Sequence, residues 1–172
     1  MYTYKRTIKS GDMIEVEYYQ SIRKIGKNYG GRKSNNSLSP AKMRKANKLR
    51  AVKHMQRLIN ANFGSGDFFC RFSAPYGTYE TEEEFRKEVG KWLYRINYRL
   101  KKQGKGRLKY IAFIECGKSG KNWHIHIIVS KEDRELLSEQ WPYQNGQNFT
   151  PLYKNENFKK LAEYITKDLT GK

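Results

Sequence analysis

Residues 109–130 have the sequence KYIAFIECGKSGKNWHIHIIVS, and this stretch decides the fold. Two runs rich in β-branched and aromatic residues flank a cluster of Gly, Lys, Ser and Asn, which is the pattern of a β-hairpin. Alternate side chains of a strand share one face, so His124 and His126 point the same way. A turn centred near residues 119 and 120 places Glu115 directly opposite His124, on that same face.

These three side chains are a candidate metal site. The strand that carries the histidines is otherwise apolar, and burying two imidazoles and a carboxylate costs free energy unless they are paired or ligated. The alternative is that each histidine is an ordinary, hydrogen-bonded residue of the strand. A set of nitrogen and oxygen donors suits Zn, Mn or Mg. The sequence offers no evident fourth ligand, so we expect an open coordination position, which favours catalysis over a structural site.

Composition limits the class of protein. A chain of 172 residues is long enough for one domain with an appendage. The net charge of +18 favours a membrane surface or a nucleic acid as partner. Because no apolar run is long enough to span a bilayer and no signal-peptide pattern is present, we expect nucleic acid, no membrane partner and a cytoplasmic location. Cys70 and Cys116 lack metal-ligand spacing and are expected to be reduced thiols.

The N-terminal part of the chain carries most of the charge. Residues 1–62 contain fifteen Lys and Arg against three Asp and Glu, and they predict a hairpin over residues 2–19 and a basic loop over residues 26–37. Ser39 and Pro40 then begin a helix that ends near Asn62. Its apolar stripe is Ala46, Leu49, Val52, Met55 and Ile59.

The other faces of this helix are basic. Charge of a single sign repels itself, and binding to a polyanion relieves that repulsion. The alternative is a solvated helix face with no partner. We expect the phosphate backbone of DNA to contact Lys45, Lys48, Lys53 and Arg57.

Residues 67–153 predict the order β-α-β-β-α-β, which is the ferredoxin-like α+β fold, an antiparallel sheet with helices on one face. A capping box at Thr81–Glu84 begins the first helix, which ends before Gly104. Its apolar stripe, expected in the core, is Phe85, Val89, Trp92, Ile96 and Leu100. In this topology the strand over residues 123–129 is central and directs both histidines to the open face. Phe69 and Arg71 share that face and are expected to contact single-stranded DNA.

The last predicted helix covers residues 157–169 and carries a candidate nucleophile. Its apolar stripe is Phe158, Leu161, Ala162, Ile165 and Leu169. Lys160, Tyr164 and Lys167 lie together beside that stripe at about 100° per residue. A tyrosine with an ordinary pKa near ~10 is a poor nucleophile at neutral pH. Two ammonium groups one turn away favour the phenolate and the approach of a phosphate.

These residues carry a resemblance to a known superfamily. His124-Ile125-His126 resembles the His-hydrophobe-His motif of HUH endonucleases, in which Glu115 occupies the place of the third metal ligand. Tyr164 and Lys167 resemble the Tyr-x-x-Lys helix that follows the metal motif in replication initiators. The region resembles the single-tyrosine rolling-circle initiators of phages and plasmids. Lys160 stands where some phage initiators have a second tyrosine.

The resemblance implies an endonuclease domain over residues 63–172, preceded by the appendage over residues 1–62. It implies a divalent ion, Mg or Mn, at the three metal ligands. Tyr164 would cleave single-stranded DNA, presented in one possible form as an origin hairpin, through a 5′-phosphotyrosine intermediate and later rejoin it. A host polymerase would extend the free 3′ end, and a host helicase would unwind the duplex, in the bacterial cytoplasm. A transposase of the same superfamily and a non-catalytic single-strand-binding module remain alternatives.

Overall fold

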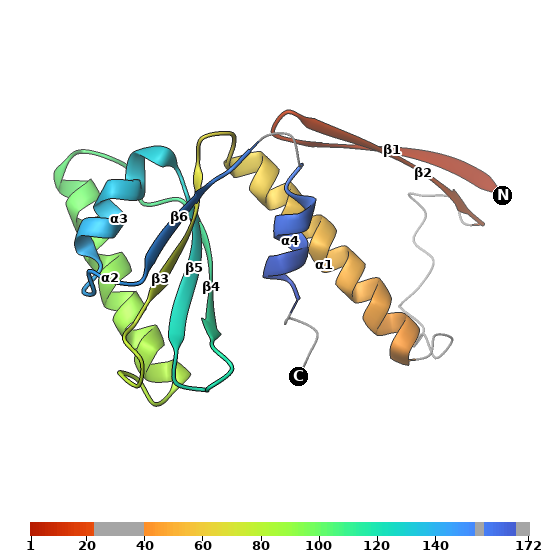
Figure 1. Ribbon diagram of the computed structural model, residues 1–172. Helices are drawn as coiled ribbons and strands as arrows, with labels where there is room; N and C mark the ends of the chain where they lie inside the picture. The colour runs from red at the N-terminus through yellow and green to blue at the C-terminus, as the bar shows by residue number, and fades with distance from the viewer. Residues whose placement is uncertain (23–39, 154–156, 168–172) are drawn as a thin grey trace, which may run out of the picture. The chain divides into compact units, whose positions relative to one another are not determined.

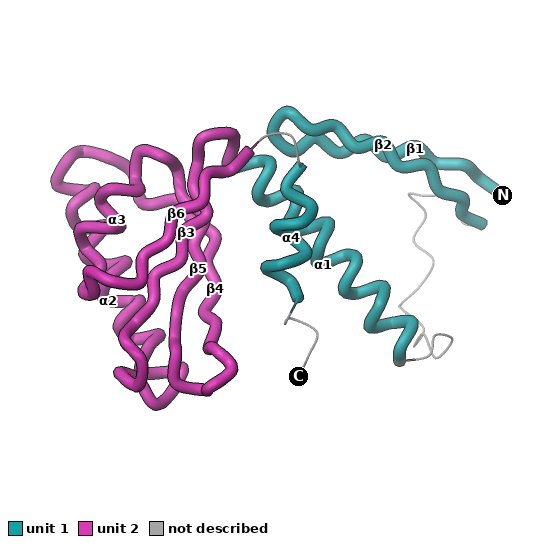
Figure 2. The backbone as a smooth tube through the Cα atoms, in the orientation of Figure 1, with its two compact units in different colours: residues 1–62, 156–172 teal, residues 63–155 magenta. Residues whose placement is uncertain are grey.

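The computed structural model describes residues 1–22, 40–153 and 157–167. The chain divides into two compact units, which Figure 2 shows in different colours. Unit 1 contains residues 1–62 and 156–172, and unit 2 contains residues 63–155. The division after residue 62 coincides with the boundary expected from the sequence, whereas the C-terminal helix groups with the N-terminal residues. The expected basic loop and Leu169 lie outside the described residues.

Unit 2 has the element order that the sequence predicts. The elements are β3 (Phe68–Ser73), α2 (Glu82–Lys102), β4 (Tyr110–Cys116), β5 (Trp123–Val129), the 3-10 turn η1 (Lys131–Asp133), α3 (Arg134–Gln140) and β6 (Gln147–Pro151). The strands form one sheet in the order β4-β5-β3-β6, and every neighbouring pair is antiparallel. This arrangement confirms the predicted ferredoxin-like α+β fold and the central position of the histidine-bearing strand.

One face of this sheet is covered by α2 and α3 (Figure 1). The predicted stripe of α2, from Phe85 to Leu100, is buried in the core. Alternate residues of β5, Ile125, Ile127 and Val129, are buried in the same core cluster. Burial of these side chains is the main favourable contribution to folding, at roughly 1.5–3 kcal/mol for each large apolar side chain.

The start of α2 is capped as predicted, with one difference. The Thr81 hydroxyl accepts a hydrogen bond from the Glu84 backbone N–H at 3.3 Å. The Glu84 carboxylate accepts from the Glu80 backbone N–H at 3.0 Å, one residue before the position that a standard capping box uses. The first turn therefore has both an N-cap and three acidic side chains, which favourably oppose the helix dipole.

The pairing of β5 fixes which residues surround the histidines on the other face of the sheet. Glu115 of β4 is the register partner of His124, as the sequence predicts. His126 is paired with Phe113 on β4 and with Arg71 on β3. In the turn between β4 and β5, the Gly117 N–H donates to the Asn122 carbonyl at 2.9 Å. The hairpin therefore sets the faces of all these side chains.

Unit 1 begins with a two-stranded hairpin of β1 (Tyr2–Ser10) and β2 (Met13–Ser21), close to the predicted ranges. Gly11 in its turn has a φ of +59°, and a Cβ added there would lie 2.0 Å from the Asn60 carbonyl oxygen. Only glycine fits both requirements, because it has no Cβ and tolerates positive φ. Asn60 belongs to α1 (Pro40–Asn62), so the hairpin turn packs directly on this helix.

The apolar stripe predicted for α1 is only partly a core. Val52 and Ile59 are buried, but Leu49 is 59% exposed. Leu49 lines an open groove together with Val16 of β2 and Val52, and the elements around that groove do not close over it. The prediction of Leu49 as a core residue was therefore wrong, because helical spacing gives the direction of a side chain and not the extent of the surface that covers it.

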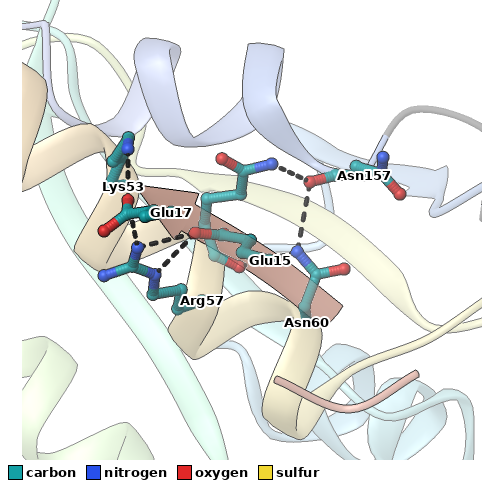
Figure 3. Close-up of polar contacts among 7 residues, drawn as sticks. Glu15, Glu17, Lys53, Arg57, Asn60 and Asn157 are labelled. Carbon is teal, nitrogen blue, oxygen red and sulfur yellow. Dashed lines mark hydrogen bonds and ion pairs between the residues drawn. The ribbon is translucent and has the colours of Figure 1, made fainter. Parts of the chain in front are cut away.

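The C-terminal helix α4 (Lys159–Ile165) is shorter than the range predicted from the sequence. Asn157 and Phe158 have left-handed backbone conformations, with φ of 45° and 51°, so the helix cannot begin before residue 159. The Asn157 carbonyl accepts hydrogen bonds from the side-chain amides of Gln56 at 2.8 Å and Asn60 at 3.1 Å (Figure 3). These bonds tie the start of α4 to α1.

The side chains of α4 otherwise follow the predicted pattern. Phe158, Ala162 and Ile165 are buried. The Thr166 hydroxyl, also buried, donates to the Ala162 carbonyl at 2.7 Å where the helix ends. Across the described residues, no helix is long and apolar enough to cross a membrane.

Candidate metal centre and nucleic-acid-binding residues

The paired strands β4 and β5 bring three potential metal ligands together in unit 2. The Glu115 Oε2 atom lies 3.1 Å from His126 Nε2 and 3.5 Å from His124 Nε2. One ligand atom from each residue lies within 4.8 Å of the other two. The carboxylate and the His124 ring are partly buried, and the His126 ring is almost fully buried. The sequence-predicted convergence of these side chains is confirmed.

The orientation of His124 fits a bound cation. Its Nδ1 lies 3.1 Å from the Asn122 carbonyl oxygen, which can only accept a hydrogen bond, so Nδ1 is the donor. In the neutral imidazole, Nε2 then presents a lone pair toward the Glu115 carboxylate. Two acceptors that face each other are stabilised by a cation between them. A hydrogen bond from the other ring nitrogen to a carbonyl is also the usual support of a metal-bound histidine.

His126 lies between two aromatic rings. The rings of Phe69 and Phe113 stack on it, with centroid distances of 5.2 and 4.8 Å and interplanar angles of 5° and 17°. Burial lowers the pKa of His126 to about 4, and the nearby His124 lowers it further, whereas Glu115 opposes this shift. At neutral pH the imidazole is therefore uncharged, and its contact with Glu115 is a hydrogen bond rather than an ion pair. A neutral imidazole is the form that binds a metal.

Two further residues on this face were expected to contact DNA. Arg71 is exposed and lies next to His126 across the strand pair, so it presents a positive charge beside the three ligands. Phe69 is only partly exposed, and one face of its ring is occupied by His126. Sequence reasoning did not single out Phe113. The register that pairs Glu115 with His124 also pairs Phe113 with His126, so the same argument could have found it.

Tyr164 lies on α4 in unit 1 and is 36% exposed. The Lys167 Nζ lies 4.4 Å from the centroid of its ring. Lys160 precedes Tyr164 by four residues on the same helix, which is about one turn. Lys167 follows the end of the helix, and its backbone N–H donates to the Tyr164 carbonyl at 3.2 Å. Positive charge therefore lies against this tyrosine, although the helix is shorter than expected.

The basic residues predicted on α1 are of two kinds. The Lys53 Nζ lies 2.6 Å from Glu17, and Arg57 contacts both Glu15 at 2.6 Å and Glu17 at 3.3 Å (Figure 3). The hydrogen bond from Lys53 lowers the pKa of Glu17. The hydrogen bond to Glu15 raises the pKa of Arg57. These two cations are thus already engaged with carboxylates of β2.

The other two cations of this predicted set differ in their surroundings. Lys45 and Lys48 are exposed, and no ion pair within the described ranges includes either of them. They line the same groove as Leu49, in unit 1. Their charges are therefore available to a polyanion in a way that those of Lys53 and Arg57 are not.

Fold and site together define an α+β protein with a ferredoxin-like sheet and a His/Glu cluster that can hold a metal ion. A family model for the replication-associated protein ORF2 matches residues 77–172, which is more than half of the chain. The chain therefore belongs to this family of replication-associated proteins. Comparisons with curated proteins and with solved structures find no match. Family membership indicates a role in replication and implies DNA binding.

Proposed function

We propose that this protein is an HUH-type endonuclease that nicks and rejoins single-stranded DNA to initiate rolling-circle replication. The observation that carries the proposal is the convergence of one carboxylate and two imidazoles on a single point of the sheet. The membership of the chain in a replication-associated family supports the same conclusion.

The metal ligands in this proposal are Glu115, His124 and His126. A divalent ion, Mg or Mn, held there would withdraw electron density from the scissile phosphate and favour nucleophilic attack on it. Asn122 fixes the His124 ring through its carbonyl oxygen. Phe69 and Phe113 hold the His126 ring from both sides and keep it in the neutral form. Arg71 contributes a positive charge that attracts the DNA backbone to this face.

Tyr164 is the nucleophile in this proposal. Its Oη forms a bond to phosphorus while the bond from phosphorus to the 3′ oxygen of the preceding nucleotide breaks. The 3′ oxygen leaves with a proton as a hydroxyl, and the 5′ phosphate remains on the tyrosine. Lys167 and Lys160 favour the phenolate and the negative phosphate, because both are cations within about one helical turn.

Rejoining reverses these bond changes. A 3′ hydroxyl attacks the phosphotyrosine, the phosphodiester re-forms, and Tyr164 regains its proton. Because the energy of the phosphodiester is kept in the covalent intermediate, no nucleotide cofactor is consumed. Between the two steps a host polymerase extends the free 3′ end, and a host helicase separates the strands. The endonuclease region in this proposal covers residues 63–172, preceded by the basic residues 1–62.

Two alternatives give different experimental results. A transposase of the same superfamily would use the same residues and differ in the DNA that it cuts. A non-catalytic single-strand-binding module would need aromatic residues on the sheet and no metal ligands, and it leaves the clustered donors without a role. Only the enzymatic proposals require a covalent protein–DNA intermediate.

The test is therefore to trap and map that intermediate. Wild-type protein incubated with labelled single-stranded DNA and Mn is expected to form a covalent band that chelator abolishes. Mass spectrometry after nuclease trimming is expected to place the nucleotide on Tyr164. Tyr164→Phe should bind DNA and form no adduct, whereas the control Tyr18→Phe, on an exposed position of β2, should react normally. A nucleotide on another tyrosine would overturn the assignment of the nucleophile.

A further inference from the structure

A groove in unit 2 combines exposed tyrosines with positive charge. It lies between the C-terminal part of α2 and the loop that follows this helix, and its volume is about 880 Å³. Its walls include Tyr94, Tyr98, Lys101, Lys102, Lys105 and Arg107. None of these residues belongs to the metal cluster, and the mechanism proposed above uses none of them.

The two tyrosine rings are available for stacking. Tyr94 and Tyr98 are one helical turn apart and are 71% and 50% exposed. Their ring planes are nearly parallel, at 16°, with centroids 6.5 Å apart. The buried stripe of α2, which includes Trp92 and Ile96, lies on the other side of the helix, because a step of two residues turns about 200°. The rings therefore contribute little to the core, and burial does not explain their presence.

The positive charge of the groove is not neutralised by ion pairs within unit 2. The Lys102 Nζ lies 4.9 Å from the centroid of the Tyr98 ring. Lys101, Lys105 and Arg107 are exposed. Over residues 40–153, no ion pair includes a cation of this groove. Like charges held this close repel each other, and an anionic ligand would relieve that repulsion.

Hydrogen bonds fix the shape of the groove. The Asn97 side chain donates to the Leu93 carbonyl at 2.8 Å and accepts from the Leu108 N–H at 3.0 Å. The Lys105 N–H donates to the Leu100 carbonyl at 2.9 Å, so the loop turns back on the end of the helix. Gly104, with a φ of +69°, permits that turn. The cations are thus held by an ordered loop rather than by a flexible tail.

We infer that this groove is a second binding site for single-stranded DNA. Unpaired bases stack on Tyr94 and Tyr98, and the phosphates between them contact the surrounding cations, which is the usual combination in single-strand-binding grooves. Duplex DNA does not fit this chemistry, because its bases are stacked on each other. The site lies on α2, which covers the face of the sheet opposite to the metal cluster. It would hold a segment of strand other than the one at the cluster.

Photo-crosslinking tests the position of the strand. An oligonucleotide of about ten nucleotides that contains 5-iodouracil is irradiated with the full chain in the presence of chelator, and peptides are mapped by mass spectrometry. Adducts are expected on Tyr94 or Tyr98. Because the proposed nicking requires metal, this result does not depend on it, and either proposal can fail alone. Adducts confined to other parts of the chain would overturn the inference.

Variants test the stacking. The double variant Tyr94→Ala, Tyr98→Ala should bind the oligonucleotide about tenfold or more weakly in fluorescence anisotropy, the decrease expected for removal of stacked rings. The matched control Tyr94→Phe, Tyr98→Phe keeps both rings and should bind like wild type. Equal affinity of the alanine variant and wild type, or equal competition by duplex of the same sequence, would overturn the single-strand assignment.

The charges give an independent measurement. Lys101→Gln combined with Lys105→Gln should lower the slope of log affinity against log salt by about 1.4, because each lysine that no longer neutralises a phosphate of a single strand lowers it by ~0.7. Lys87→Gln, an exposed lysine near the other end of the same helix, is the control and should leave the slope unchanged. An unchanged slope in the double variant would show that the groove does not contact phosphate.

Discussion

Replacing Glu115 by glutamine separates metal binding from folding. The substitution keeps the shape of the side chain and removes its charge. In the metal-free protein, Glu115 accepts a hydrogen bond from the neutral His126 ring at 3.1 Å, and the glutamine carbonyl can accept the same bond. The free energy of unfolding without metal should therefore change by less than about 1 kcal/mol.

The effect of metal should be much larger in the wild type. A ligand that binds only the folded state at 100 times its dissociation constant stabilises a protein by about 2.7 kcal/mol. For a chain of this size, each kcal/mol raises Tm by roughly 2–4 °C, so Mn should raise the Tm of the wild type by about 5–10 °C. The variant loses the one anionic donor of the cluster. An affinity lower by about 100-fold would leave only about 0.4 kcal/mol at the same Mn concentration, which is a shift of about 1 °C.

Thermal unfolding followed by circular dichroism, with Mn or with chelator, measures both quantities. Glu135→Gln is the matched control, because Glu135 is an exposed residue of α3 outside the cluster. It should show the full Mn shift. If Glu115→Gln kept the Mn shift of the wild type, the metal would bind elsewhere and the proposed ligand set would be refuted.

Two further predictions follow from charge and burial. Lys45→Gln combined with Lys48→Gln should lower the salt slope of DNA binding by about one to two units, at ~0.7–0.9 for each phosphate neutralised. Lys53→Gln should change it less, because the Lys53 Nζ already pairs with Glu17; an equal effect would contradict this distinction, and anisotropy titrations at several salt concentrations decide it. Burial raises the pKa of the Cys70 thiol to about 12, so at pH 8 only about one molecule in ten thousand carries the reactive thiolate. Alkylation followed by mass spectrometry should label the partly exposed Cys116 in the folded protein and Cys70 only after unfolding; rapid labelling of native Cys70 would contradict the burial.

The sequence by itself determined the topology of unit 2 and the metal cluster. Both depend on local patterns: period-two runs for strands, a 3.6-residue apolar stripe for α2, and turn residues between them. The position of the turn between β4 and β5 fixes the register of the hairpin, and the register alone places Glu115 opposite His124. Two positions on one strand and one on its neighbour need no further information to converge.

Only the tertiary structure decided the contacts between segments far apart in the chain. Lys53 and Arg57 pair with Glu17 and Glu15, which lie some forty residues earlier, and no periodicity of α1 indicates this neutralisation. The same holds for the Asn157 carbonyl, which receives two amides of α1.

The groove on α2 shows both sources of information at once. Its tyrosines follow from helical spacing, because residues four apart share a face. Its cations gather there only because the loop after the helix turns back and is held by Asn97. Local spacing fixes the direction in which a side chain points, whereas its neighbours depend on how elements pack and how the chain returns, which local sequence does not specify.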